Sequence, residues 1–157
     1  MDMLSAPNRA AAVDLLAPWQ SVMARGTAAA RQGQLLLAMS SFQEALAIAR
    51  ALLAAPGERC DDCVAALVVS HHNLAEVQAD AGGSDLAATQ LAQAHETLMR
   101  LLCDPAADGA LQQAALRHSR ETHAALLLHL EANGPHPAIS RALRAGCLGL
   151  AVGGPVH

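Results

Sequence analysis

The sequence repeats itself internally. Residues 22–53 and residues 71–102 share one pattern of small and large side chains at a constant offset of 49 positions, without a gap. The aligned pairs are Gly26 with Ala75, Gly33 with Gly82, Ala38 with Ala87, Phe42 with Leu91, Ala45 with Ala94, and Leu52-Leu53 with Leu101-Leu102. Self-similarity at a fixed spacing is typical of stacked repeats. The pattern therefore predicts paired helices that stack side by side.

The residues of this chain favour helix almost everywhere. Hydrophobic residues make up 53% of the sequence, but aromatic residues only 1%, so most of the apolar content is Ala and Leu. These two residues are among the strongest helix formers, whereas the β-branched residues that favour strands are sparse. We expect one all-α domain, because 157 residues suffice for a single core.

Gly, Pro and polar clusters divide the chain into about six helices. The breakers lie at 31–34, 56–57, 82–85, 104–109 and 133–135. Residues 1–13 are expected to form a flexible N-terminal arm, and Pro18 then lies near the start of the first helix, where its missing N–H costs little. Residues 153–157 form a tail. The expected helices span about 14–31, 35–54, 58–81, 84–103, 110–132 and 137–152.

Short connections predict that consecutive helices pack antiparallel. The helices then pair into three units, at about 14–55, 58–103 and 110–152. The third unit matches the second more weakly, at an offset of 52. Its matches are Leu74 with Leu126, Gly82 with Gly134, Leu91 with Leu143, and Leu98 with Leu150.

The repeated residues resemble the tetratricopeptide repeat (TPR). The first unit carries Gly26, Gly33, Ala38, Phe42 and Ala45, and the second carries Ala75, Gly82, Ala87, Leu91 and Ala94. The resemblance implies helix–turn–helix repeats stacked as a short right-handed superhelix, with a concave face that holds a protein or peptide. The offset of 49 exceeds the family's unit of about 34 residues, and Val22 and His71 stand where that family often has Trp. The variant is thus elongated and atypical. An Ala-rich bundle without a groove is the alternative.

The same resemblance implies which residues line the concave face. The first unit would contribute Met23, Thr27 and Arg31, and the second His72, Glu76 and Asp80. The last three stand four residues apart, which places them on one stripe of a helix. A His and two carboxylates suit a basic or polar peptide, or a metal ion if another helix adds a ligand. A simple solvated helix face fits the same pattern.

A second cluster, Cys60-Asp-Asp-Cys63 followed by His71-His72, suggests a metal site for zinc or copper. If residues 60–72 form one straight helix, Cys63 and His71 lie about 12 Å apart along its axis. One ion cannot bridge that distance. A site would need the cysteines in a loop, or ligands such as His95, His118 or His123. Structural thiols are therefore the favoured interpretation, and metal binding and redox sensing are the alternatives.

The remaining polar residues suggest no chemistry. Cys103 and Cys147 are expected to be small buried residues, His129 a core histidine, and His118 and His123 surface residues. No nucleophile stands with a base, and no phosphate loop or paired acid and base is present. We therefore expect a protein that is not an enzyme and that needs no cofactor.

Charge and hydropathy exclude further classes of partner. The net charge is −4 and the ten basic residues form no stripe, so a nucleic-acid partner is not expected. No apolar run reaches the ~18 residues that span a bilayer, and the N-terminus lacks the features of a signal peptide. These observations favour the cytoplasm, where the cysteines stay reduced.

The last expected helix is apolar on most sides from Leu143 to Val152. Because stacked repeats need a polar terminal cap, residues 143–152 either pack on the body or bury against a second copy, as a homodimer. The sequence as a whole predicts a protein- or peptide-binding adaptor. The alternative is a metal-binding or metal-sensing helical protein that uses Cys60, Cys63 and histidines.

Overall fold

The structure is a computed structural model that describes the backbone of residues 6–152 and the side chains of residues 15–146. Six helices and no strand occur in this range, which confirms the all-α fold. They are α1 (Ala6–Arg31), α2 (Leu35–Ala54), α3 (Cys60–Asp80), α4 (Ser84–Cys103), α5 (Gly109–Asn133) and α6 (Pro137–Val152).

The first helix begins earlier than expected. α1 starts at Ala6, so residues 6–13, which were expected to belong to a flexible arm, are helical. The run Ala10-Ala11-Ala12 explains this, because Ala is the best helix former. Pro18 consequently lies inside α1 and not near its start. There its ring removes one backbone hydrogen bond of the helix.

The first two hairpins have the same turn. Gly33 and Gly82 both have positive φ, at 72° and 86°, a conformation that only Gly adopts without strain. The helices on either side end and begin at matching positions, since α2 and α4 are each 20 residues long and start 49 positions apart. The backbone hydrogen bonds match too: Gln34 N to Ala29 O at 2.9 Å corresponds to Gly83 N to Gln78 O at 2.7 Å.

The packing inside the first two hairpins also corresponds. In the first, Phe42 of α2 lies directly against Gly26 of α1, where a Cβ would come within 2.6 Å of the ring. In the second, Leu91 of α4 and Ala75 of α3 belong to one buried cluster. A larger residue on one helix thus accompanies a smaller residue on the other, as the repeat predicts.

The third hairpin is built differently. α6 packs mainly against α4 and only slightly against α5, although α5 is its partner in sequence. Gly134 ends α5 with φ 81° and ψ −177°, and its N–H donates to Leu130 O, four residues back, at 2.8 Å. At Gly33 and Gly82 the N–H instead donates three residues back, to Ala30 O and Ala79 O. The weaker sequence match of this unit therefore corresponds to a real change in geometry.

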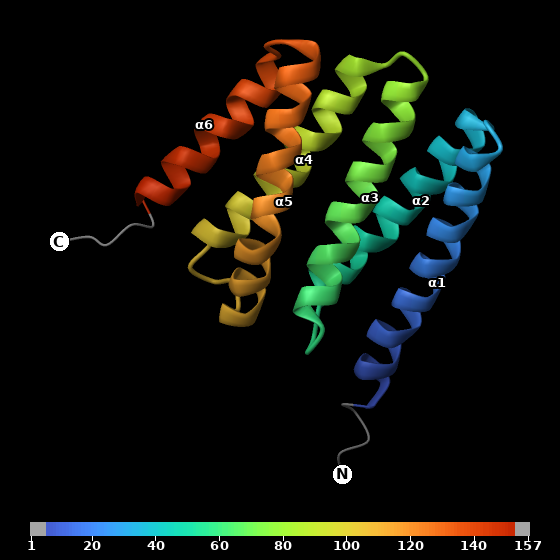
Figure 1. Cartoon of the computed structure of the whole chain (residues 1–157). Helices are drawn as coiled ribbons and strands as arrows, with labels where there is room; N and C mark the ends of the chain where they lie inside the picture. Colours follow the sequence, from blue (N-terminus) through green and yellow to red (C-terminus); the bar gives the residue numbers. More distant parts are fainter. Residues whose placement is uncertain (1–5, 153–157) are drawn as a thin grey trace.

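The helices form an open row. Figure 1 shows α1 (blue) and α6 (red) on opposite sides, with α3 between α1 and α5. Within the described residues α1 contacts only α2 and α3, and α2 does not contact α4. α3 is central, because Leu74, Ala75 and Val64 each belong to a different buried cluster.

One helix is long and apolar enough to cross a membrane. Residues Leu35–Ala54 of α2 have a mean hydropathy of 1.3, contrary to the expectation that no apolar run is long enough to span a bilayer. One face of α2 is buried against α1 and α3 through Ala38, Phe42, Ala45 and Ala49. The core helix of a soluble protein can meet the same criterion, so this is weak evidence for a membrane span.

Candidate functional site

A pocket of about 290 Å³ lies between α1 and α3, with α2 at its base. Four of the six residues expected on the concave face line it: Thr27, Arg31, Glu76 and Asp80. They are two pairs of repeat positions, because Thr27 aligns with Glu76 and Arg31 with Asp80 at the offset of 49. The remaining lining residues are Ala30, Phe42, Asn73 and Val77.

The charged residues of this pocket are available to a ligand. Arg31, Glu76 and Asp80 are exposed, and none of them has an ion-pair partner among the described side chains. An exposed charged side chain without an ion-pair partner is solvated by water, so a ligand of opposite charge displaces only water when it binds. The pocket thus offers one guanidinium on α1 and two carboxylates on α3.

A second hollow, of about 330 Å³, continues the same seam toward the other end of α1 and α3. Its walls include Trp19 and Gln20 of α1, Asp62 and Val69 of α3, and Arg59 just before α3. Trp19 is half-buried, and its Nε1–H donates to Ser70 Oγ at 2.8 Å, which fixes the indole against α3. The two hollows are about 10 residues apart along the helices, or about 15 Å.

Met23 and His72 do not belong to the pocket. Met23 is only 8% exposed and packs in the core. His72 is half-buried, and the charge that affects it is Glu121 of α5. The reason is helix geometry: each step of four residues advances 40° beyond a full turn, so a stripe at four-residue spacing drifts round the helix. At the pocket end of α3 the stripe faces α1, and at His72 it has turned toward α5.

Asn73 lines the pocket although the sequence analysis did not select it. It stands three residues before Glu76, and residues three apart on a helix are neighbours on its surface. This spacing was a signal for Asn73. Trp19, in contrast, had no comparable signal, because its position depends on how closely α1 approaches α3.

The structure does not bring together the residues of the alternative metal site, Cys60, Cys63, His71 and His72. Residues 60–80 form one continuous helix, so Cys63 and His71 are separated along its axis as calculated above. Cys60 and Cys63 are both buried, in different clusters. Burial raises the pKa of each thiol, which disfavours the thiolate that binds metals. Among the described residues no group of three His, Cys, Asp or Glu side chains could hold an ion.

His71 has a structural partner in place of a metal. Its Nδ1 lies 2.9 Å from Gln90 Oε1 on α4, and the side chain is 1% exposed. Burial lowers its pKa to about 4, so the imidazole is neutral at neutral pH. His72 Nε2 is also buried and has no hydrogen-bond partner among the described residues. Burial lowers the pKa of His72 as well.

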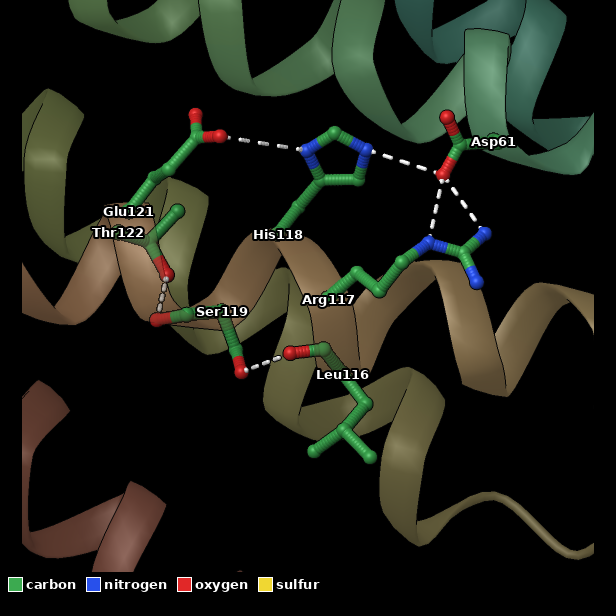
Figure 2. Close-up of polar contacts among 7 residues, drawn as sticks. All are labelled: Asp61, Leu116, Arg117, His118, Ser119, Glu121 and Thr122. Carbon is green, nitrogen blue, oxygen red and sulfur yellow. Dashed lines mark hydrogen bonds and ion pairs between the residues drawn. The ribbon is translucent and has the colours of Figure 1, made fainter.

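His118 belongs to a polar network between α3 and α5 (Figure 2). Asp61 Oδ1 accepts from Arg117 Nη2 at 2.8 Å and lies 3.2 Å from His118 Nε2. Hydrogen bonding to Arg117 is the main reason that the pKa of Asp61 is lowered. Glu121 Oε1 lies 3.9 Å from the other ring nitrogen of His118. The network connects the second hairpin to the third; its charged residues are exposed, whereas His118 is half-buried.

Two further expectations have mixed outcomes. His129 is buried as expected, with Asn133 Nδ2 3.4 Å from its Nδ1. Cys103 is exposed and not buried, because it is the last residue of α4 and has passed the packed part of the helix. Cys147 and most of the 143–152 segment lie outside the described side chains, so the proposed dimer contact lies there as well. Residues 137–146 pack against α4.

Comparison with known proteins gives a family without an assigned activity. No curated protein and no solved structure matches the chain. One family model matches residues 17–151, which include most of α1 and nearly all of α6. This chain therefore belongs to the family described as "Protein of unknown function (DUF2753)".

Proposed function

We propose that this protein is a non-enzymatic, cytoplasmic adaptor that binds a protein or peptide segment along the α1–α3 seam, in the manner of an elongated TPR-like repeat. The observation that carries this proposal is the convergence of repeat positions. Thr27 and Arg31 meet Glu76 and Asp80 in one pocket. Repeat proteins build a binding face in this way, because equivalent positions of successive units line one surface.

The seam suits an extended segment better than a small molecule. Its two hollows lie one after the other along α1 and α3. The amphipathic ring of Trp19 is in the wall of the larger hollow, and the charged residues Arg31, Glu76 and Asp80 line the smaller one. A segment of about five extended residues spans the ~15 Å between them. Trp side chains are enriched at binding surfaces, because they combine large apolar area with a polar group.

The charges indicate the chemistry of the segment. Glu76 and Asp80 are four residues apart on α3, so a Lys or Arg side chain can lie between their carboxylates. Arg31 on α1 faces them across the pocket and suits a backbone carbonyl or a carboxylate. We infer a polar peptide with at least one basic residue, followed or preceded at about five residues by an apolar residue for the Trp19 hollow.

The test is a peptide library with fixed basic and apolar positions, measured by fluorescence anisotropy. Peptides with Lys or Arg at the expected spacing should bind to the full chain. The double variant Glu76→Gln/Asp80→Asn should bind them about 3- to 10-fold more weakly, as expected for the loss of two exposed charge pairs. The variant keeps the shape of both side chains, and both are exposed, so folding should be unaffected.

The matched control is Asp104→Asn/Glu131→Gln, which removes two exposed carboxylates outside both hollows. It should bind the same peptides as the unmodified chain does. Equal loss of affinity in both double variants would reduce the effect to net charge and reject the pocket. Equal affinity of the pocket variant and the unmodified chain would also reject it.

A further inference from the structure

A second pocket lies at the other side of the molecule, between α4, α5 and α6. Its volume is about 260 Å³, and most of its wall is apolar, with Met99 and Leu102 from α4 and Leu143 from α6. It shares no residue with the α1–α3 seam. Its position follows from the third hairpin, where α6 leaves α5 and packs on α4. Concave, mainly apolar pockets with a few polar groups are the usual sites of small ligands.

A buried histidine faces this pocket. His95 of α4 is 3% exposed and lies in the pocket wall. Gly146 of α6 makes room for it, because a Cβ at that position would be 2.9 Å from His95 Nε2. Nε2 has no hydrogen-bond partner among the described residues. Because His95 lines the cavity and the described protein groups do not use its Nε2, this nitrogen is available to a ligand atom.

The hydrogen bonds around His95 determine which ring nitrogen carries the proton. Thr122 Oγ1 donates its only hydrogen to Ser119 O at 3.1 Å (Figure 2). The same oxygen is 2.8 Å from His95 Nδ1; when the hydroxyl donates to Ser119 O it can only accept from the ring, and in that arrangement Nδ1 carries the hydrogen. Nε2 therefore presents a lone pair to the pocket. Burial lowers the pKa of His95, which keeps the ring neutral.

Two groups at the pocket add to this acceptor. The His123 ring of α5 lies with its centroid 5.9 Å from that of His95, tilted by 50°, and offers an aromatic surface to a ligand. Arg120 also lines the pocket, is exposed, and has no ion-pair partner among the described side chains. The pocket thus combines an apolar wall, one buried acceptor and one guanidinium.

We propose that this pocket binds a small hydroxylated aromatic carboxylic acid. The hydroxyl O–H donates to His95 Nε2, the ring lies among Met99, Leu102 and His123, and the carboxylate pairs with Arg120. The volume limits the ligand to a single-ring compound, because it is below the usual range of 300–1,000 Å³ for drug-sized ligands. This inference does not depend on the peptide function, since the two sites use different residues.

The probes are the three hydroxybenzoate isomers and 4-hydroxyphenylacetate, which vary the distance between hydroxyl and carboxylate. Nuclear magnetic resonance of the full chain with ¹⁵N-labelled histidine follows the ring nitrogens of His95 during titration. At least one probe should shift Nε2 of His95 in a saturable way. Its methyl ether, which cannot donate a hydrogen bond, should bind about tenfold more weakly. The unliganded spectrum should show the proton on Nδ1.

Variants separate the parts of the site. Arg120→Gln should weaken the acid but not the corresponding phenol, whereas Arg144→Gln, an exposed arginine outside the pocket, should change neither. Thr122→Val removes the acceptor for Nδ1–H, so the tautomer should shift and the preference for hydroxyl over ether should fall. The proposal is overturned if no probe shifts His95, if the ethers bind as well as the hydroxyl compounds, or if the proton lies on Nε2.

Discussion

The first two hairpins and the third hairpin show what a repeat does and does not preserve. α1–α2 and α3–α4 share the end of the first helix, both bounds of the second helix, the Gly turn and its hydrogen bonds at a constant offset. α5–α6 keeps the Gly at its turn, but the N–H of Gly134 donates four residues back and not three, and α6 packs on α4. Where the sequence match is strong, equivalent positions meet in the seam; where it weakens, a different pocket opens.

The comparison shows that turn geometry and helix packing are preserved together. A turn with the same backbone angles directs the next helix along the same path, so the same side chains meet. When the turn changes, as between α5 and α6, the next helix packs on a different helix, which here is α4. Four changes test whether the first two hairpins are equivalent and the third is different.

The largest effect should come from the close contact in the first hairpin. Gly26→Val places atoms where the Phe42 ring already lies, since even a Cβ would be 2.6 Å away. We expect a loss of about 3 kcal/mol in the free energy of unfolding, the upper part of the range for overpacked cores. Urea denaturation measures it.

The equivalent change, Ala75→Val against the smaller Leu91, should cost only about 1 kcal/mol. Phe42→Leu in the Gly26→Val background should recover part of the lost stability, because the smaller side chain makes room. Additive losses in that double variant would mean that Gly26 and Phe42 are not in contact.

The next effect is a dependence on pH in the second hairpin that the first hairpin, which has no His, lacks. Burial lowers the pKa of His71 to about 4, whereas the unfolded chain titrates near 6.5. Above pH 6.5 the His71 imidazole is mainly neutral in both the folded and the unfolded chain, so its titration does not lower the free energy of unfolding. As the pH falls from about 6.5 to about 4, the unfolded state binds a proton that the folded state does not, so stability falls by roughly 2 to 3 kcal/mol.

His71→Val installs the residue that the first hairpin has at this position, Val22. It should remove most of that pH dependence, and the remainder should come from His72, His95 and His129, whose pKa values are also lowered by burial. An unchanged slope of urea stability against pH in this variant would contradict the assignment to His71.

The turns should separate the third hairpin from the others. Gly134 has φ 81° and ψ −177°, a region that is essentially restricted to Gly, so Gly134→Ala should cost about 2 kcal/mol. Gly33→Ala and Gly82→Ala lie at φ 72° and 86° and should cost about 1 kcal/mol each. Thermal unfolding of the three variants gives the order. Unequal costs at Gly33 and Gly82 would show that their turns are not equivalent.

The smallest effect should come from the network between the second and third hairpins. Asp61→Asn weakens the contacts of Asp61 with Arg117 and His118. Because the carboxylate and the guanidinium are both more than half exposed, we expect about 0.5 kcal/mol, and less at high salt. Glu44→Gln, which weakens the exposed pair with Arg25 inside the first hairpin, is the matched control.

The candidate site could be predicted only in part. The offset of 49 indicated Thr27, Arg31, Glu76 and Asp80, because these positions repeat and the helices that carry them are neighbours. It also indicated Met23 and His72, which the structure places elsewhere. A stripe drawn along one helix does not show which neighbour each residue faces, since that depends on where α2 and α5 cover the helix surface.

The sequence by itself determined the helices and the duplicated turn. Ala and Leu favour helix through short-range effects, and Gly33 and Gly82 fix the turn through their own backbone angles; both properties act within a few residues. Tertiary structure alone decided that α6 packs on α4, that Cys60 and Cys63 lie in separate clusters, and that His95 faces a cavity. Those outcomes depend on how side chains distant in sequence fill space together, which no local pattern specifies.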